Sequence, residues 1–176
     1  MVISPRRRAA PAEPSFLEGY LPYLLGLASY AINKDFDGDV KAAGLSPLEW
    51  RTLATLSDCD GMTVGALCRK VVSRQPTQTK AIKRLDEIGL VRREDDASDL
   101  RRTRVFITAR GRAVARDLIR AAKAHERQMV RHLTPAQLDA LTSALRQILA
   151  QGQLAGRVAP ELLPAARRDQ PLEDAA

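Results

Sequence analysis

The sequence predicts a mainly α-helical chain with one small β-hairpin, an α+β arrangement. Apolar residues recur at helical spacing through most of residues 15–151, which indicates a series of amphipathic helices. Residues 90–107 instead hold two short β-prone stretches separated by a charged segment. A short helix, a turn, a basic helix and then a hairpin follow one another over residues 63–108, which is the order found in a winged helix-turn-helix.

The charge of the chain gathers where this motif is predicted. The 176 residues include 28 basic and 21 acidic ones, a net charge of +7. Between residues 62 and 110 there are twelve basic and six acidic residues, so most of the surplus lies in less than a third of the chain. A basic surface that coincides with a helix-turn-helix favours duplex DNA as the partner.

The N-terminal part is predicted to be a tail followed by one helix. Residues 1–14 hold three prolines and three arginines with little to bury, which predicts a disordered basic tail; an arm that reaches the minor groove is the alternative. A helix is expected from about Ser15 to Asp35, with leucines at helical spacing and a wide apolar face. Residues 15–45 are therefore interpreted as a dimerisation helix and a linker.

Helix-start signals mark the winged helix-turn-helix, which is assigned to residues 46–108. Ser46-Pro-Leu-Glu49 is a capping box that opens a helix to about Leu56, and Thr63 caps the next helix. The fourth helix begins around Gln75 with a proline in its first turn and runs to Ile88, where Gly89 follows as a left-handed C-cap. Strands are predicted at Leu90–Arg93 and Arg104–Ile107, with a long charged loop, Glu94–Thr103, between them.

Two further helices and a tail complete the chain. Thr108 caps a long helix from about Ala109 to Leu133, and Thr134-Pro-Ala-Gln137 repeats the capping-box pattern before the last helix. Residues 109–151 are interpreted as C-terminal dimerisation helices, because they carry more apolar surface than a small winged helix can cover. Recurrent Gly and Pro predict a loosely attached or disordered tail over residues 152–176.

The fourth helix and the hairpin carry the residue types that contact DNA. Thr and Gln near a helix N-terminus suit base edges, whereas Lys and Arg further along suit phosphates. Asp99 and the arginines after it are placed for a hairpin tip that enters the minor groove, with the aspartate orienting a guanidinium. The residues predicted to contact DNA are Arg74, Gln75, Thr77, Gln78, Thr79, Lys80, Lys83, Arg84, Asp99, Arg101, Arg102 and Arg104. A solvated basic face is the alternative for the helix alone.

From about Ser15 to Gln151 the chain resembles the MarR family of transcriptional regulators. The matching motifs are Gln75-Pro76-Thr77, the run Arg84-Leu85-Asp86-Glu87-Ile88-Gly89-Leu90-Val91, Asp99-Leu100-Arg101 and Val105-Phe-Ile-Thr108 followed by Gly111-Arg112. The resemblance implies an obligate dimer with interlocking terminal helices, acting mostly as a repressor and often released by aromatic or phenolic acids. It implies that Thr77, Gln78 and Thr79 lie at the base-reading end of the helix and Arg101 at the wing tip.

The expected partners are a second copy of the chain, pseudo-palindromic double-stranded DNA and a small aromatic acid. Tyr20, Tyr23, Tyr30, Trp50 and Arg51 are the candidate residues for an effector pocket, and packing in the core is their alternative role.

Other function classes find little support in the sequence. Cys59 and Cys68 do not form a disulfide scaffold, and His125 and His132 lack the spacing of a helical metal pair, so no metal or cofactor is expected. No catalytic motif indicates an enzyme. The absence of a secretion signal and of a membrane-spanning segment favours the cytoplasm. An architectural or anti-repressor module without a small-molecule response is the alternative function.

Overall fold

The computed structural model describes residues 15–96 and 99–154, and for residues 96, 99–102, 153 and 154 it describes the backbone alone. The tail predicted at residues 1–14 and most of the one predicted at 152–176 therefore lie outside the described residues. The chain divides into two compact units, Met1–Asp35 and Phe36–Ala176.

The first helix differs from its prediction at both ends. Instead of one helix from Ser15 to Asp35, the structure has α1 (Phe16–Gly19) and α2 (Leu21–Ala42). Pro22 explains the break, because its ring has no N–H and would clash with the carbonyl four residues earlier in a continuous helix. At the other end α2 continues past Asp35, since Phe36 and Val40 are buried in the core of the second unit.

The helix-turn-helix consists of α3 (Pro47–Asp58), α4 (Val64–Lys70) and α5 (Gln75–Glu87), close to the predicted boundaries. The capping box of α3 is confirmed: the Ser46 amide donates to Glu49 Oε2 at 2.7 Å, and the Glu49 amide donates to Ser46 Oγ at 3.3 Å. Thr63 caps α4 through the Ala66 amide. Gly89 ends α5 with a φ of +73°, as its C-cap assignment requires.

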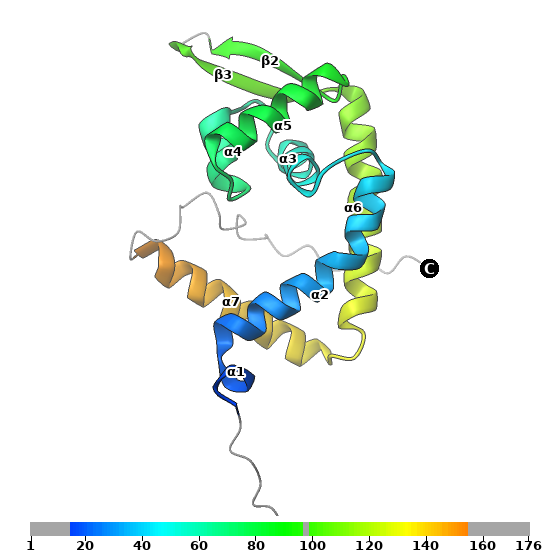
Figure 1. The fold of residues 1–176 in the computed structure, drawn as a ribbon, viewed down its shortest axis with the longest axis vertical. Coiled ribbons are helices and arrows are strands. Elements are labelled where there is room, and N and C mark those ends of the chain that lie inside the picture. Colours follow the sequence, from blue (N-terminus) through cyan, green and yellow to red (C-terminus); the bar gives the residue numbers. More distant parts are fainter. Residues whose placement is uncertain (1–14, 97–98, 155–176) are drawn as a thin grey trace, which may run out of the picture. The chain divides into compact units, whose positions relative to one another are not determined.

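A three-stranded antiparallel sheet forms the wing, in the order β1-β3-β2. Its two longer strands, β2 and β3, lie side by side in Figure 1. It consists of β1 (Met62–Thr63), β2 (Val91–Asp96) and β3 (Asp99–Ile107). The two-residue β1 was not predicted, because a pair of residues shows no periodicity. The prediction of a loop over Glu94–Thr103 is wrong, since most of this segment belongs to β2 or β3: Glu94 lies opposite Arg104 and Asp95 opposite Thr103.

The physical reason for this error is solvent exposure. The side chains of residues 92–95 are exposed, so this part of the hairpin has no apolar side whose alternation would mark a strand. Hydrogen bonding of the backbone, which every residue can provide, holds the ladder instead.

Two long helices follow the sheet. Thr108 caps α6 (Ala109–Val130) by accepting the Gly111 amide at 3.0 Å, and α6 ends three residues before the predicted Leu133. The predicted capping box before α7 (Pro135–Leu154) is present, because the Thr134 amide donates to Gln137 Oε1 at 2.9 Å and the Gln137 amide to Thr134 Oγ1 at 3.3 Å.

Gly111 lets α6 lie directly on the chain segment between α5 and β2. The Leu90 carbonyl accepts the Thr108 amide at 3.0 Å and the Thr108 hydroxyl at 3.1 Å. A Cβ on residue 111 would lie 2.0 Å from that same carbonyl oxygen. A side chain is therefore excluded at this position, and the absence of one sets how closely α6 joins the winged helix.

The core of the second unit lies where α3, α4, α5, α6 and the sheet meet. Large apolar side chains that are fully buried there include Leu53, Leu56, Leu67, Leu85 and Val105. No helix in the described part of the chain has the length and apolarity needed to cross a bilayer.

Candidate DNA interface

The outer side of α5 presents the polar residues predicted to contact DNA. Arg74, Gln75, Thr77, Thr79, Lys80 and Lys83 are all exposed. Arg74 occupies the N-cap but gives no side-chain hydrogen bond to the first turn. First-turn amides of a helix have no partner within it, so this end of α5 offers N–H groups and a positive dipole end to a phosphate.

Gln78 is a correction to the sequence prediction. Its side chain is fully buried, so it does not reach a base. Its Nε2 donates to Thr52 Oγ1 at 2.9 Å, and its Oε1 accepts the Ser73 hydroxyl at 2.9 Å. Thr52 in turn donates to the Leu48 carbonyl at 2.8 Å. Gln78 thus joins α3, the turn before α5 and α5 itself, and it contributes to the packing of α5.

The physical reason is the position of Gln78 on α5. Together with Ala81, Ile82 and Leu85 it follows the i, i+3, i+4, i+7 pattern of a buried helix face. A buried amide is tolerated there because both its donor and its acceptor side find partners.

Arg84, also predicted to contact DNA, is held by groups at the start of α3. Its Nη1 lies 2.7 Å from Glu49 Oε2, and its Nη2 donates to the Gly44 carbonyl at 2.8 Å. The Glu49 carboxylate is buried and also accepts the Ser46 amide. Arg84 therefore ties α5 to the cap of α3, and its contact with DNA stays a prediction.

The hairpin places the predicted wing residues on a strand. Asp99, Arg101 and Arg102 belong to β3, and their side chains lie outside the described residues. The register pairs Asp96 with Asp99 and Asp95 with Thr103, with an irregularity between Asp95 and Asp96. Asp95 and Asp96 are adjacent on β2, whereas Leu100–Arg102 separate their partners on β3. The assignment of Arg101 to the tip remains a prediction. Arg104 is exposed and donates to the Gly61 carbonyl at 3.0 Å.

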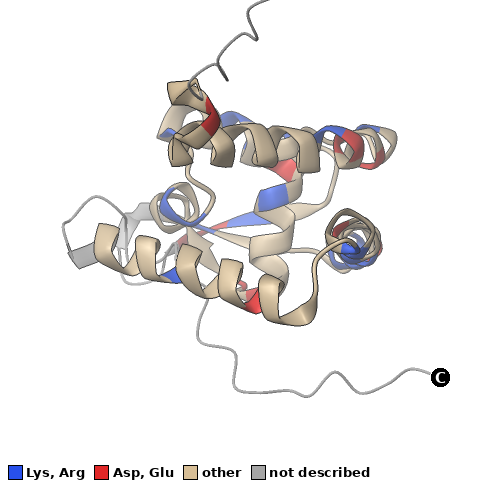
Figure 2. Cartoon of the chain, turned by 90° about the horizontal axis from the view of Figure 1, so that it is seen from below, with Lys and Arg blue, Asp and Glu red and all other residues tan. Residues whose placement is uncertain are grey.

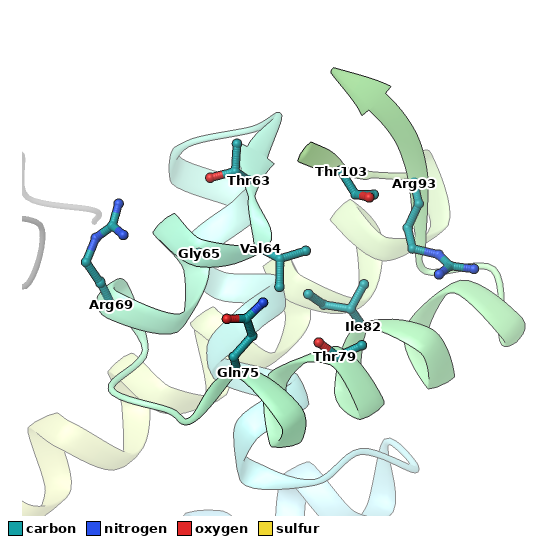
Figure 3. Close-up of a pocket in the computed structure, with 9 residues that line it drawn as sticks. All are labelled: Thr63, Val64, Gly65, Arg69, Gln75, Thr79, Ile82, Arg93 and Thr103. Atoms are coloured by element: carbon teal, nitrogen blue, oxygen red, sulfur yellow. The ribbon is translucent and has the colours of Figure 1, made fainter. Parts of the chain in front are cut away.

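A hollow of about 510 Å³ lies between α4, α5 and the sheet (Figure 3). Arg69 and Arg93 stand at its two sides, with Val64 and Ile82 between them. Its lining residues are Thr63, Val64, Gly65, Arg69, Gln75, Thr79, Ile82, Arg93 and Thr103. Guanidinium, amide and hydroxyl donors around an apolar floor suit a phosphate group and the sugar beside it.

Ion pairs fix the sheet against the helices around it. Arg93 Nε donates to Asp86 Oδ2 at 2.8 Å and so joins β2 to α5. Asp60 is a second anchor: its Oδ1 accepts the Gly61 amide at 3.0 Å and the Ile107 amide at 2.9 Å, and its Oδ2 accepts the Arg112 guanidinium of α6. The hairpin, α5 and α6 are thereby held as one unit.

Several of these residues were missed by the sequence prediction. Thr63, Arg69, Arg93 and Thr103 come together at the hollow only through the fold, and no local motif links them. Asp60-Gly61 did carry a signal, because an Asp-Gly pair indicates a turn. The pairing of that turn with β3 depends on contacts distant in sequence.

The five residues predicted for an effector pocket lie in two different units. Tyr20, Tyr23 and Tyr30 are exposed in the first unit. In the second unit Trp50 packs edge-on against Phe36, with the ring centroids 5.5 Å apart, and Arg51 Nε donates to the Pro47 carbonyl at 3.3 Å. These contacts agree with a packing role for Trp50, and the pocket remains a prediction.

Comparison with known proteins identifies the family. The MarR family model matches residues 45–103, the segment that contains α5 and most of the hairpin. The crystal structure of a MarR-family transcriptional regulator from Silicibacter pomeroyi is 37% identical, with a TM-score of 0.69, over 77% of this chain and 91% of that one. The chain belongs to the MarR family. This MarR-family protein is therefore a transcriptional regulator with a winged helix, as its motifs predicted.

Two further relatives agree. The MarR-family regulator SPO1453 from Silicibacter pomeroyi is 34% identical, with a TM-score of 0.68, over 77% of this chain and 99% of that one. The transcriptional regulator HosA of Escherichia coli is 27% identical over 105 residues, which are 60% of this chain and 78% of HosA.

Proposed function

We propose that this MarR-family protein is a homodimeric repressor that reads a pseudo-palindromic operator and leaves it when a small aromatic or phenolic acid binds. The proposal that the protein binds DNA rests on one surface, which is formed by the outer side of α5, the hollow beside it and the hairpin. MepR of Staphylococcus aureus, solved with DNA, shares the fold at 20% identity.

Roles on this surface follow from residue chemistry and position. Thr77 and Thr79 lie in the first turns of α5 and are exposed, so they are assigned to base edges or the thymine methyl group. Lys80 and Lys83 are assigned to phosphates, which fix the position of the protein on the duplex. The hollow beside α5 is assigned to the backbone strand that passes between the helix and the hairpin. Gln78 is removed from the contact set because it is buried.

Unpartnered apolar surface supports the dimer. Exposed large apolar residues of the first unit include Phe16, Leu21 and Tyr30, and in the second unit Leu141 and Ile148 of α7 are also about half exposed. Surfaces of this kind commonly mark protein–protein interfaces. A two-fold dimer would place two copies of α5 in major grooves about one helical turn of DNA apart, roughly 10–10.5 base pairs.

Support for an acid effector comes from proteins of the same fold. BpsR of Bordetella bronchiseptica, at 23% identity, is regulated in its DNA binding by 6-hydroxynicotinic acid, and Rv2887 of Mycobacterium tuberculosis, at 24% identity, was solved with salicylic acid. The Arg51 guanidinium, next to Trp50 in the chain, has the chemistry to hold such a carboxylate.

The proposal is tested by selecting bound sequences from a random DNA pool and measuring binding to the selected site. If about eight phosphates are neutralised per dimer, log affinity should fall with log salt with a slope near −7. Lys80→Gln should reduce that slope by about one unit per protomer, whereas Thr79→Ala should relax sequence preference by about 1–3 kcal/mol at one position. A monomer by light scattering, or binding abolished by random competitor DNA, would contradict the proposal.

The effector is tested separately by calorimetry with aromatic acids. Arg51→Ala should weaken acid binding and leave operator affinity in the absence of acid unchanged. Equal acid affinity in the two proteins would remove Arg51 from the effector site.

A further inference from the structure

A row of exposed cations runs along α6. It consists of Arg116, Arg120, Lys123 and Arg127, all exposed, and is called the α6 basic stripe here. Their spacings of four, three and four residues place them on one face of a helix. The opposite face of α6 is buried at Gly111, Ala115 and Leu118. Figure 2, which views α6 nearly along its axis, shows Lys and Arg on this helix in blue.

The charge of the stripe is poorly compensated. The four cations and Ile119 line a shallow surface hollow of about 490 Å³, and among residues 15–96 and 99–154 no acidic residue lines it. Asp117 pairs with Arg120, but within the described residues no carboxylate pairs with Arg116, Lys123 or Arg127. An ordinary solvated helix face usually mixes charges of both signs. A face with one sign is suited to an anionic partner.

The length and straightness of the stripe favour a linear polyanion over a small anion. From the first to the last of its cations the helix rises about 16 Å, taking 1.5 Å per residue. Each strand of duplex DNA carries a phosphate about every 3.4 Å along the axis, so the stripe spans roughly five phosphates. The arginine side chains can also pair with phosphates in bidentate fashion.

We propose that the α6 basic stripe is a second, sequence-independent surface for the phosphate backbone of duplex DNA. The inference rests on the proposed function only in taking this protein to bind DNA. The stripe lies opposite the face of α6 that packs on α3. The stripe is therefore left open by the packing of α6 on α3, and its partner in this proposal is DNA that flanks the operator and bends towards the protein.

Four cations bind DNA weakly by themselves, but their affinity for flanking DNA rises because they are part of the same chain as α5 and the hairpin. Once α5 is seated on its site, flanking DNA is present at the stripe at a high effective concentration. The stripe should thus add affinity that depends on duplex length and on salt, without changing which sequence is preferred.

The test compares two variants on two duplexes. The stripe variant carries Arg116→Gln, Arg120→Gln, Lys123→Gln and Arg127→Gln, because glutamine favours helix and keeps part of the aliphatic side chain. The control variant carries Lys34→Gln, Lys41→Gln, Arg131→Gln and Arg146→Gln, which are also exposed. Each variant removes four positive charges and so lowers the net charge from +7 to +3. The operator is the DNA sequence selected for binding. It is used in a short duplex of about 25 base pairs and, centred, in a long duplex of about 80 base pairs.

Wild type and control should bind the long duplex about 10-fold more tightly than the short one, with a salt slope steeper by at least about 2. The stripe variant should lose most of this difference and bind the short duplex like the control. Equal affinity of wild type for both duplexes, or equal length dependence in the two variants, would overturn the proposal. If the wild-type protein did not bind the short duplex at all, the proposed function itself would be refuted. Circular dichroism checks that each variant is folded. The Arg116→Gln/Lys123→Gln double variant is a milder second test, which should lose part of the length dependence.

Discussion

Gly111→Ala tests the claim that close contact between α6 and the chain after α5 holds the winged helix together. The glycine is helical, so alanine would normally stabilise it by about 0.5–1 kcal/mol. Here the added methyl group would lie 2.0 Å from the Leu90 carbonyl oxygen and 2.9 Å from Ile107 Cγ1. Neither neighbour can move easily. The Leu90 carbonyl is backbone that already accepts two hydrogen bonds from Thr108, and the Ile107 side chain is buried in the core.

The size of the effect follows from the required displacement. A carbon–oxygen contact needs more than about 3 Å, so the first turn of α6 must move by at least roughly 1 Å, which breaks its bonds to Leu90. Overpacking of this kind costs about 1–3 kcal/mol, and the loss of two hydrogen bonds adds about 1 kcal/mol each. A net loss of about 2–4 kcal/mol is expected, which lowers the melting temperature by roughly 5–15 °C for a chain of this length.

The assay is thermal unfolding followed by circular dichroism, with Gly38→Ala as the matched control. Gly38 is also helical, but a Cβ there would meet nothing within 4 Å. The same chemical change should therefore raise stability at residue 38 by about 0.5–1 kcal/mol and lower it at residue 111. If the two variants shifted the melting temperature in the same direction, the close contact at Leu90 would not have the importance inferred from the structure.

Substitutions at three other residues test local features of the fold. Gln78→Leu should reduce the free energy of unfolding by about 1–3 kcal/mol in urea titration, because the Ser73 hydroxyl loses its buried acceptor; an unchanged midpoint would show that the network does not matter. Val72 has a φ of 53°, unusual for a β-branched residue, and its side chain is 71% exposed, so Val72→Gly should raise stability by about 0.5–1 kcal/mol, and a loss would refute the claim of strain. Asp60→Asn keeps an oxygen for the Ile107 amide but loses the charge that pairs with Arg112, so calorimetry should show about 1 kcal/mol lost, whereas Asp60→Ala should lose clearly more.

Much of the fold was predictable because its signals are local. Ser46, Thr63, Thr108 and Thr134 each start a helix through their own side chains and amides a few residues away, so residue identity alone was informative. Gly89 likewise marks a chain reversal that few other residues tolerate. The order of elements and the family could be predicted from such signals together with the basic residues of α5.

Contacts between distant residues decided the rest. The hairpin is longer than predicted because backbone pairing extends where side chains are exposed and carry no alternation. Gln78 looked like a base-reading residue by type, yet its place on the helix put it in the core, where Thr52 and Ser73 satisfy its amide. Its helical spacing contained that information, but the partners that make burial of an amide acceptable come from other elements.

The sequence by itself therefore determined where the helices start, which helix carries the basic residues, and which family the chain resembles. Only the tertiary structure decided which polar residues of that helix face outward, how Arg84 and Asp60 are engaged, and where the cations of α6 gather. The physical reason is that capping and periodicity act within a few residues, whereas burial and ion pairing depend on side chains that folding brings together from distant parts of the chain.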